Sequence, residues 1–276
     1  IQGELWEKDP SRVPVCIECH QPHEVRRVFY DEGMSDKECL VCHENPDLTR
    51  EDQDGLQKSL FVNHDTLLGS AHTKVRCIQC HTGATPTHER PCDTVPDRVD
   101  CSVCHAEQVE VYATSIHGML GSQGDPDTPD CLLCHGSHDI LKKDDPESRT
   151  YVRNIPDLCG NCHDEGGVAD KRYEGTQGSM VANYRESVHG RALNNSGLVV
   201  TATCTDCHTS HGILPSKDVG SSVHRSKIDE TCATCHEGID RTFRESIHFT
   251  GEARGEHPLP MCNDCHSSHE IARTDA

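Results

Sequence analysis

Cysteine and histidine recur along this chain as the pentapeptide Cys-x-x-Cys-His, which occurs nine times. Two thiols at this spacing, followed at once by a histidine, attach a c-type haem: the thiols bond to the porphyrin and the histidine binds the iron. The predicted attachment cysteines are Cys16, Cys19, Cys39, Cys42, Cys77, Cys80, Cys101, Cys104, Cys131, Cys134, Cys159, Cys162, Cys204, Cys207, Cys232, Cys235, Cys262 and Cys265. The pattern predicts nine covalently attached haem c groups, each holding an iron.

Two other uses of paired cysteines explain less of the pattern. Zinc sites also contain Cys-x-x-Cys pairs, but zinc gives no reason for a histidine to follow every pair. Disulfides within such pairs would close very small loops and constrain little of the unfolded chain. Haem accounts for both residue types, so the motif histidines are predicted to bind one face of each iron: His20, His43, His81, His105, His135, His163, His208, His236 and His266.

The motifs are organised in internal repeats. Residues 101–138 (the second repeat) and 232–269 (the fourth repeat) align without a gap, and residues 159–211 (the third repeat) follow with insertions. Residues 39–88 (the first repeat) match more loosely, and residues 16–23 match the second half of a repeat. Each full repeat has a leading motif, a Ser-x-His tripeptide, a closing motif and a trailing histidine.

One half-repeat and four two-haem repeats therefore account for nine sites. Such repeats predict an elongated stack with units 1–38, 39–100, 101–158, 159–231 and 232–276, forming one continuous haem-packed domain.

The repeats also supply a second histidine for each iron. The Ser-x-His tripeptides contribute His72, His117, His189 and His248; the trailing histidines are His88, His138, His211 and His269, with His23 in the half-repeat. Two neutral imidazoles make a six-coordinate, low-spin haem suited to electron transfer. His224 is the alternative to His88 for the ninth position, although the matching place before Cys159 holds Tyr151.

These second histidines are not expected to bind the nearest haem in sequence. His117 lies twelve residues after His105, about 18 Å along a helix. His138 lies three residues after His135, which is too short a link to pass around a porphyrin. Each is therefore expected to reach a neighbouring haem and to tie two haems together.

Three residues fall outside this scheme. His64 and His257 are expected at the surface. Cys92 is the odd cysteine, for which a free or buried thiol and an intermolecular disulfide are both open.

The composition supports a core made of cofactor. The chain is 33% hydrophobic and 4% aromatic, against a usual apolar share of roughly 45–50%. Nine porphyrins supply the missing apolar surface. The predicted fold is mainly irregular, with very little β structure and short helices after motifs, for example 106–115 and 238–246.

Charge and hydropathy limit the partners and the compartment. The formal net charge of −20 disfavours nucleic acid. No apolar run reaches the roughly 18 residues of a membrane helix. Because covalent haem is attached outside the cytoplasmic membrane, we expect an exported chain whose signal sequence has been removed, located in the periplasm or at the cell surface.

The sequence Cys-x-x-Cys-His-x-Ser-His at 204–211 and 262–269, with Ser-Val-His-Gly at 187–190, resembles multihaem cytochromes c of respiring bacteria and archaea. The resemblance covers essentially the whole chain. It implies an electron carrier or extracellular conduit in anaerobic respiration, whose partners are other redox proteins or further copies of itself in a filament. Its half-repeat is then available to pair with the last haem of another copy.

The alternative implied by the same resemblance is a reductase of nitrogen or sulfur oxyanions with one open iron. All nine motifs end in histidine, and enough histidines exist to close every iron. The conduit is therefore favoured over an enzyme.

Overall fold

The computed structural model describes residues 35–51, 55–82, 84, 99–173, 175, 178–251 and 259–273. Several predicted or discussed residues lie outside this part of the chain: Cys16, Cys19, His20, His23, His88, Cys92 and His257. The chain divides into two compact units, one formed by Ile1–Asp65 with Thr73–Asp100 and the other by Thr66–His72 with Cys101–Ala276. The five-unit division predicted from the repeats stays a prediction.

The first unit contains the described elements of the first repeat. Helix α4 (Asp36–His43) carries the leading motif and is followed by strands β1 (Thr49–Glu51) and β2 (Gln57–Ser59). The strands form an antiparallel hairpin in which Thr49 faces Ser59. Helix α6 (Cys77–Cys80) is linked to α4 because the Asp36 carboxylate accepts a hydrogen bond from the Cys77 N–H at 3.0 Å. Helix α5 (His64–Gly69) lies at the junction of the two units in sequence.

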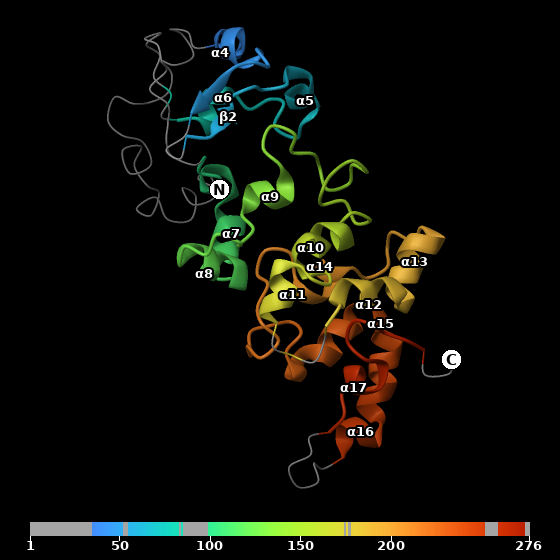
Figure 1. Ribbon diagram of the computed structural model, residues 1–276. Coiled ribbons are helices and arrows are strands. Elements are labelled where there is room, and N and C mark those ends of the chain that lie inside the picture. The colour runs from blue at the N-terminus through green and yellow to red at the C-terminus, as the bar shows by residue number, and fades with distance from the viewer. Residues whose placement is uncertain are drawn as a thin grey trace, which may run out of the picture. The chain divides into compact units, whose positions relative to one another are not determined.

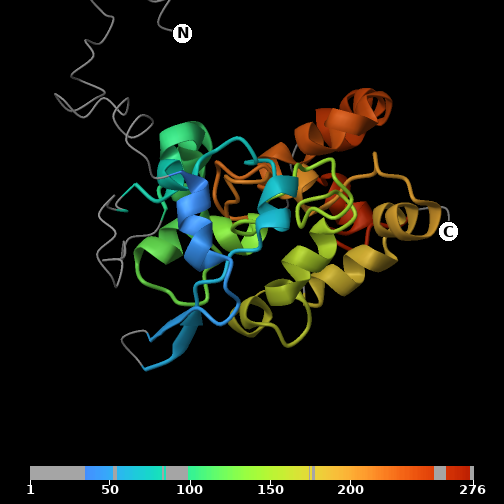
Figure 2. The same ribbon diagram turned by 90° about the horizontal axis from the view of Figure 1, so that it is seen from above.

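The second unit is made of helices and loops (Figures 1 and 2). In chain order its helices are α7 (Ser102–Ala113), α8 (Ile116–Ser122), α9 (Cys131–His135), α10 (Ile155–His163), α11 (Val168–Arg172), α12 (Met180–Glu186), α13 (Val188–Ser196), α14 (Cys204–His208), the 3-10 turn η2 (Arg225–Lys227), α15 (Ile228–Glu245), α16 (Ile247–Thr250) and α17 (Cys262–His266). Helix α10 packs against α12 and α14, and α15 packs against α16 and α17. The prediction of short helices, loops and very little β structure is confirmed.

The haem motifs themselves form helices, because residues in and beside them cap the first turn. The Asp130 carboxylate accepts a hydrogen bond from the Leu133 N–H at the start of α9. Asp206 accepts from the Thr203 N–H at the start of α14, and Asp264 accepts from the Met261 N–H at the start of α17. Capping of the free N–H groups makes helices of only five residues possible.

The helices expected over 106–115 and 238–246 are present but begin earlier. Helix α15 starts at Ile228 and includes its whole motif, whereas α7 starts at Ser102 and includes its motif except Cys101, which is the N-cap. In both helices the motif histidine leaves helical geometry, with φ −116° at His105 and φ −103° at His236. The motif turn and the helix after it are therefore separate segments joined by a kink at the histidine.

Three closing motifs end in the same backbone turn. The residue after the motif histidine has positive φ in each: 84° at Gly136, 67° at Thr209 and 62° at Ser267. Threonine and serine rarely adopt this conformation, which costs on the order of 1–3 kcal/mol outside glycine. The turn directs the chain away from the motif, and the trailing histidine follows two residues later.

Side chains alone make only a small core. Among the described residues the buried hydrophobic side chains are Leu40, Ile155, Val181, Tyr184 and Leu193. Several apolar residues between motif cysteines are exposed, with Val41 at 78% and Val103 at 60%. This exposure is the arrangement expected if bound porphyrins supply the missing apolar contacts. Within the described residues, no helix is both long and apolar enough to cross a membrane.

Candidate haem-iron sites

Histidine rings from different repeats meet in pairs. Five such pairs lie in the described part of the second unit: His72 with His105, His117 with His163, His135 with His211, His189 with His236, and His208 with His269. Their ring centroids are 6.0–6.3 Å apart. In every pair one ring is a motif histidine and the other is a Ser-x-His or trailing histidine.

The spacing of these rings fits one metal ion between them. Imidazole nitrogens bind transition metals at about 2 Å, so two rings on opposite sides of one iron have centroids about 6 Å apart. Rings in direct van der Waals contact would stack closer than this. The His208 and His269 rings are almost parallel, at 9°, whereas His72 and His105 are inclined by 63°. Both arrangements leave a gap where an iron fits.

The pairs follow one rule along the repeats. A Ser-x-His histidine meets the leading-motif histidine of the next repeat, as His117 meets His163 and His189 meets His236. A trailing histidine meets the closing-motif histidine of the preceding repeat, as His211 meets His135. No pair joins two histidines of the same repeat within the described residues. Each pair therefore links one repeat to its neighbour.

Backbone hydrogen bonds repeat with the same register. In each of these Ser-x-His tripeptides, the backbone N–H of the middle residue donates a hydrogen bond. The acceptor is the carbonyl of the residue two positions after the trailing histidine of the next repeat. These bonds run from Ala71 to Ile140 at 2.7 Å, from Ile116 to Ile213 at 2.8 Å, and from Val188 to Ile271 at 2.9 Å. Each bond holds the Ser-x-His segment of one repeat beside the trailing segment of the next.

The serine of the tripeptide fixes where its histidine lies. Ser187 is 1% exposed, and its hydroxyl accepts a hydrogen bond from the Gly190 N–H at 3.0 Å. This bond caps α13, and His189 then occupies the first turn. A Cβ on Gly190 would lie 2.0 Å from the Tyr184 carbonyl oxygen, so the close approach requires glycine. Ser115 and Gly118 in the second repeat form the same arrangement.

The tyrosine before the tripeptide anchors this segment to the closing motif. The Tyr184 hydroxyl donates to the Ala202 carbonyl at 2.9 Å, two residues before Cys204. The Tyr112 hydroxyl donates to the Pro129 carbonyl at 2.7 Å, two residues before Cys131. The fourth repeat has Phe243 at this position and lacks the hydroxyl.

Burial lowers the pKa of several paired histidines, which favours the neutral form that metal binding needs. Burial, followed by the nearby His269, lowers the pKa of His208 to about 4. Burial also lowers the pKa of His163 and, with His236 nearby, of His189. A neutral imidazole keeps a nitrogen lone pair for a metal, so the environment favours ligation over protonation.

Two motif histidines are oriented by their own loops. The Nδ1 atom of His43 lies 2.7 Å from the Leu60 carbonyl, and that of His266 lies 3.0 Å from the Ala272 carbonyl. A carbonyl partner fixes the proton on Nδ1 and leaves Nε2 for a metal. Within the described residues, neither ring has another imidazole paired with it. His248, in the fourth tripeptide, is likewise exposed and without a ring partner there.

The motif cysteines of neighbouring sites also approach one another. A hydrogen bond with Cys204 and burial raise the pKa of Cys159, and burial with the nearby Cys262 raises the pKa of Cys232 to about 12. Both pairs join the leading and closing motifs of one repeat. Between repeats, burial raises the pKa of Cys207, and Cys235 adds to the effect. The atoms predicted to bond successive porphyrins therefore lie close together.

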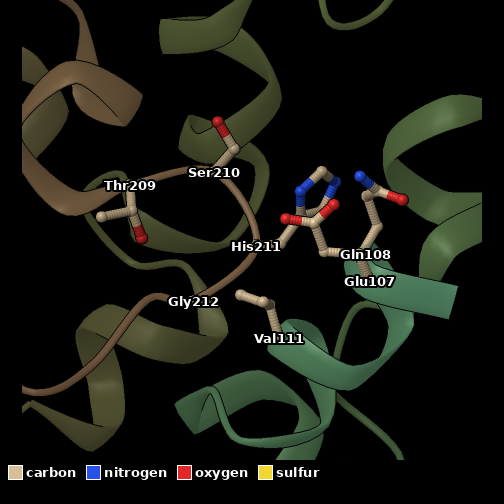
Figure 3. A pocket seen from close by; sticks show the side chains of 7 residues that line it. All are labelled: Glu107, Gln108, Val111, Thr209, Ser210, His211 and Gly212. Carbon is tan, nitrogen blue, oxygen red and sulfur yellow. The ribbon is translucent and has the colours of Figure 1, made fainter. Parts of the chain in front are cut away.

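A cavity of about 410 Å³ lies beside one histidine pair (Figure 3). It is lined by Glu107, Gln108 and Val111 of α7 and by the turn from Thr209 to Gly212, which carries His211. His211 is the partner of His135. The positive-φ turn at Thr209 thus lies at the edge of this cavity, where it places the trailing histidine.

His64 and His224 have partners outside these pairs. The Nδ1 atom of His64 is 3.4 Å from a Glu44 carboxylate oxygen. His224 caps η2, and its ring contacts the Ser226 hydroxyl at 2.8 Å. The described residues contain no cluster of three or more His, Cys, Asp or Glu side chains that could hold a metal ion without a porphyrin. The described histidines that come together in the second unit therefore do so in pairs.

Comparison with known proteins leads to the same chemistry. A family model described as a doubled CXXCH motif matches residues 197–241, which contain the closing motif of the third repeat and the leading motif of the fourth. The multiheme cytochrome MtrA of Shewanella baltica (strain OS185) is 24% identical over 208 residues, covering 72% of this chain and 51% of the relative. The chain thus spans about half the length of that relative. No solved structure matches.

Proposed function

Because the chain is a multihaem c-type cytochrome, we propose that it carries electrons along nine covalently bound haems, each with two histidine ligands. The motif histidine supplies one ligand, and a Ser-x-His or trailing histidine of a neighbouring repeat supplies the other. The haem irons would exchange the electrons. The protein's own residues bind the porphyrins, orient the axial imidazoles and exclude water from the sites.

The observation that carries this proposal is the set of histidine pairs between repeats. Each pair lies at the spacing of two ligands on one iron. Because the two rings come from different repeats, an iron bound between them would fix the position of one repeat against the next. Fixed positions keep the distance between successive haems constant, as rapid electron transfer requires.

The cysteines support a continuous series of haems. Cys134 lies near Cys159 and Cys162, and Cys207 lies near Cys235. With the contacts inside each repeat, these approaches connect the sites beginning at Cys131, Cys159, Cys204, Cys232 and Cys262 in chain order. We therefore propose a wire-like path through these five sites. The same proposal includes the predicted ligands that lie outside the described residues.

This arrangement favours a carrier or conduit over an enzyme. A reductase needs an iron with an open position for its substrate. The five pairs would hold five irons from both faces, and an iron held in this way would exchange electrons without binding substrate. We propose that the protein works outside the cytoplasmic membrane in anaerobic respiration, with other redox proteins or further copies of itself as partners.

The proposal is tested by counting the haems and identifying their ligands. Intact-mass spectrometry of the mature protein should show nine haems, and spectra of the oxidised protein should be dominated by low-spin, bis-histidine iron. His211→Ala should open the iron of the motif Cys131–His135 and create one carbon monoxide site on reduction. His224→Ala is the matched control and should create none. An unchanged spectrum in the His211 variant would reject the pairing rule.

A further inference from the structure

We propose that Arg172 is a positioning residue: its two ion pairs tie the third repeat to the second and keep His117 on the iron of the motif Cys159–His163. The inference rests on the proposed function, since it assumes a haem between His117 and His163. It makes one axial ligand of this chain dependent on exposed charges, and therefore on the ionic strength of the surroundings.

His117 and His163 form one of the histidine pairs between repeats. Their ring centroids lie 6.3 Å apart, and the rings are inclined by 52°. His117 is the second residue of the short helix α8, and His163 is the last residue of α10. Both rings can bind one iron only while α8 stays fixed against the third repeat.

The third repeat has an insertion that begins directly after its leading motif. Ser187 follows His163 by 24 positions, whereas the corresponding spacing is ten positions in the second and fourth repeats. The insertion contains α11, which packs against the motif helix α10. A Cβ on Gly167, the N-cap of α11, would lie 2.3 Å from the Cys162 carbonyl oxygen. Helix α11 therefore starts in close contact with the haem motif.

Arg172 is the last residue of α11, and its side chain reaches the second repeat. Its guanidinium donates to an Asp125 carboxylate oxygen at 2.6 Å and also to the Asp127 carboxylate. One planar guanidinium thus binds two carboxylates at once, which a lysine cannot do in the same geometry. The hydrogen bond from Arg172 lowers the pKa of Asp125, so this carboxyl keeps the charge that the ion pair needs.

The loop that receives Arg172 is closed onto the end of α8. The chain turns back at Gly124, with φ 83°, and the Asp125 N–H then donates to the Leu120 carbonyl at 3.2 Å. The Asp125 side chain also accepts a hydrogen bond from the Asp127 N–H at 3.0 Å, which fixes the two acidic residues relative to each other. A force on these carboxylates therefore acts on the helix that carries His117.

Helix α8 is anchored to the third repeat at both ends. At its start the Ile116 N–H donates to the Ile213 carbonyl at 2.8 Å, and near its end Arg172 binds the loop. Helix α13, which carries His189, has the corresponding backbone bond at its start. Residues 192–203, at the end of α13 and after it, contain no charged side chain, so an ion pair of this kind cannot form there.

The ion pairs of Arg172 are open to solvent. The Arg172 side chain is 50% exposed, and those of Asp125 and Asp127 are 18% and 43% exposed. Dissolved salt screens exposed charges, and exposed ion pairs contribute little each. Loss of these ion pairs should therefore change how often His117 leaves the iron by a modest factor and should leave the fold intact.

The test measures how fast carbon monoxide binds to the reduced, haem-loaded protein. Carbon monoxide binds a six-coordinate iron only after an axial histidine has left, so the rate at one iron reports how firmly its histidine is held. His117→Ala identifies the signal, because it opens this iron completely. Arg172→Gln should keep nine haems and raise the rate at the same iron about threefold at low ionic strength.

Matched variants separate the ion pairs from a general change of charge. Arg241 is exposed and paired with Glu237 at 3.2 Å inside α15, so Arg241→Gln is the control and should leave the rate unchanged. Asp125→Asn combined with Asp127→Asn should act as Arg172→Gln does. Adding Arg172→Gln to that pair should have no further effect, because the same contacts are already lost.

Ionic strength tests the same contacts without any substitution. In the parent protein, added salt should raise the rate at the His117 iron towards the rate of Arg172→Gln. The rate of the Arg172→Gln protein should not change with salt. The iron that His189→Ala opens provides the comparison within the molecule, since its rate in the parent should be independent of salt.

The inference is wrong if Arg172→Gln leaves the rate at this iron unchanged, or if the parent's rate does not respond to salt. It is also wrong if Arg172→Gln opens a second iron or accelerates binding in the His117→Ala protein, because the ion pairs would then act on the fold in general. If His117→Ala opened no iron, the pairing rule of the proposed function would fail, and this inference with it. An inactive Arg172→Gln beside an active His117→Ala would reject this inference alone.

Discussion

The third and fourth repeats carry nearly the same tripeptide in different surroundings. In the third, Ser187 is buried, the Val188 N–H is bonded to Ile271, and His189 is paired with His236. In the fourth, Ile247 and His248 are exposed, and neither has these partners in the described chain. The partners of the third repeat, His236 and Ile271, belong to the repeat that follows it in this sequence. Burial of the tripeptide is therefore a property of neighbouring repeats together, as in repeat proteins generally.

Other features are the same in both repeats because they are local. The residue after the closing-motif histidine has φ 67° at Thr209 and 62° at Ser267. An arginine two residues before the tripeptide serine also forms ion pairs in each, Arg185 with Asp157 and Asp164, and Arg244 with Asp229 and Asp240. The comparison thus separates what a repeat builds alone from what its neighbour supplies.

The largest expected difference is between His189 and His248. His189→Ala should open one iron and lower the free energy of unfolding of the loaded monomer by about 4 kcal/mol, the range for loss of a metal ligand. His248→Ala should have a smaller effect on stability, because His248 is exposed and has no ring partner among the described residues. Denaturant unfolding and carbon monoxide titration of dilute protein measure both. Equal effects of the two substitutions would contradict the comparison.

Exchange of the residue after the tripeptide should give the next largest effect. Gly190→Phe should cost about 3 kcal/mol, because its Cβ would collide with the Tyr184 carbonyl. The fourth repeat has Phe249 there, against Phe243 and 5.0 Å from the Arg244 guanidinium carbon. Phe249→Gly should cost only about 1 kcal/mol. Thermal unfolding of the two loaded proteins compares them, and a tolerated phenylalanine at 190 would refute the close approach.

The anchoring hydroxyl should have a smaller effect. Tyr184→Phe leaves the Ala202 carbonyl without its donor and should destabilise the protein by about 1 kcal/mol. Phe243→Tyr in the fourth repeat should change stability by less than this. Denaturant midpoints measured with the haem load checked by mass would test the pair. If Phe243→Tyr raised stability by more than Tyr184→Phe lowered it, the fourth repeat would contain a hydrogen-bond acceptor that Phe243 leaves unused.

The smallest differences are expected at the local turn. Thr209→Gly and Ser267→Gly should each stabilise the protein by about 1 kcal/mol, since glycine adopts positive φ without strain. The gains should be equal in the two repeats, because the turn does not depend on a neighbour. Gly136→Ala should have the opposite sign, since a Cβ would lie 2.4 Å from an Asp139 oxygen. Unequal gains in stability from Thr209→Gly and Ser267→Gly would mean that contacts with a neighbouring repeat affect the turn.

The sequence predicted which histidines come together better than it predicted what surrounds them. The motif spacing predicted haem, and the repeat alignment separated His117 and His189 from His64 without any coordinates. The chain distance from His135 to His138 also indicated that ligands come from other repeats. Which repeat supplies each ligand depends on the packing of segments far apart in sequence, and the alignment carries no such information. The turn at Thr209 could not be predicted either, because threonine rarely adopts the positive φ that this turn requires.

A Ser-x-His histidine pairs with the next repeat, whereas a trailing histidine pairs with the preceding one. This difference bears on the order in which the sites can be completed as the chain is made. His189 serves a repeat that is made later, whereas His211 serves one that has already been made. On the proposed function, a chain that emerges from its N-terminus first would complete the closing site of each repeat only after the next repeat has appeared. Haem attachment would then overlap in time with ligand binding, and an emerging repeat would carry a temporarily open iron. A truncation between repeats should then disturb the last complete repeat more than any earlier one.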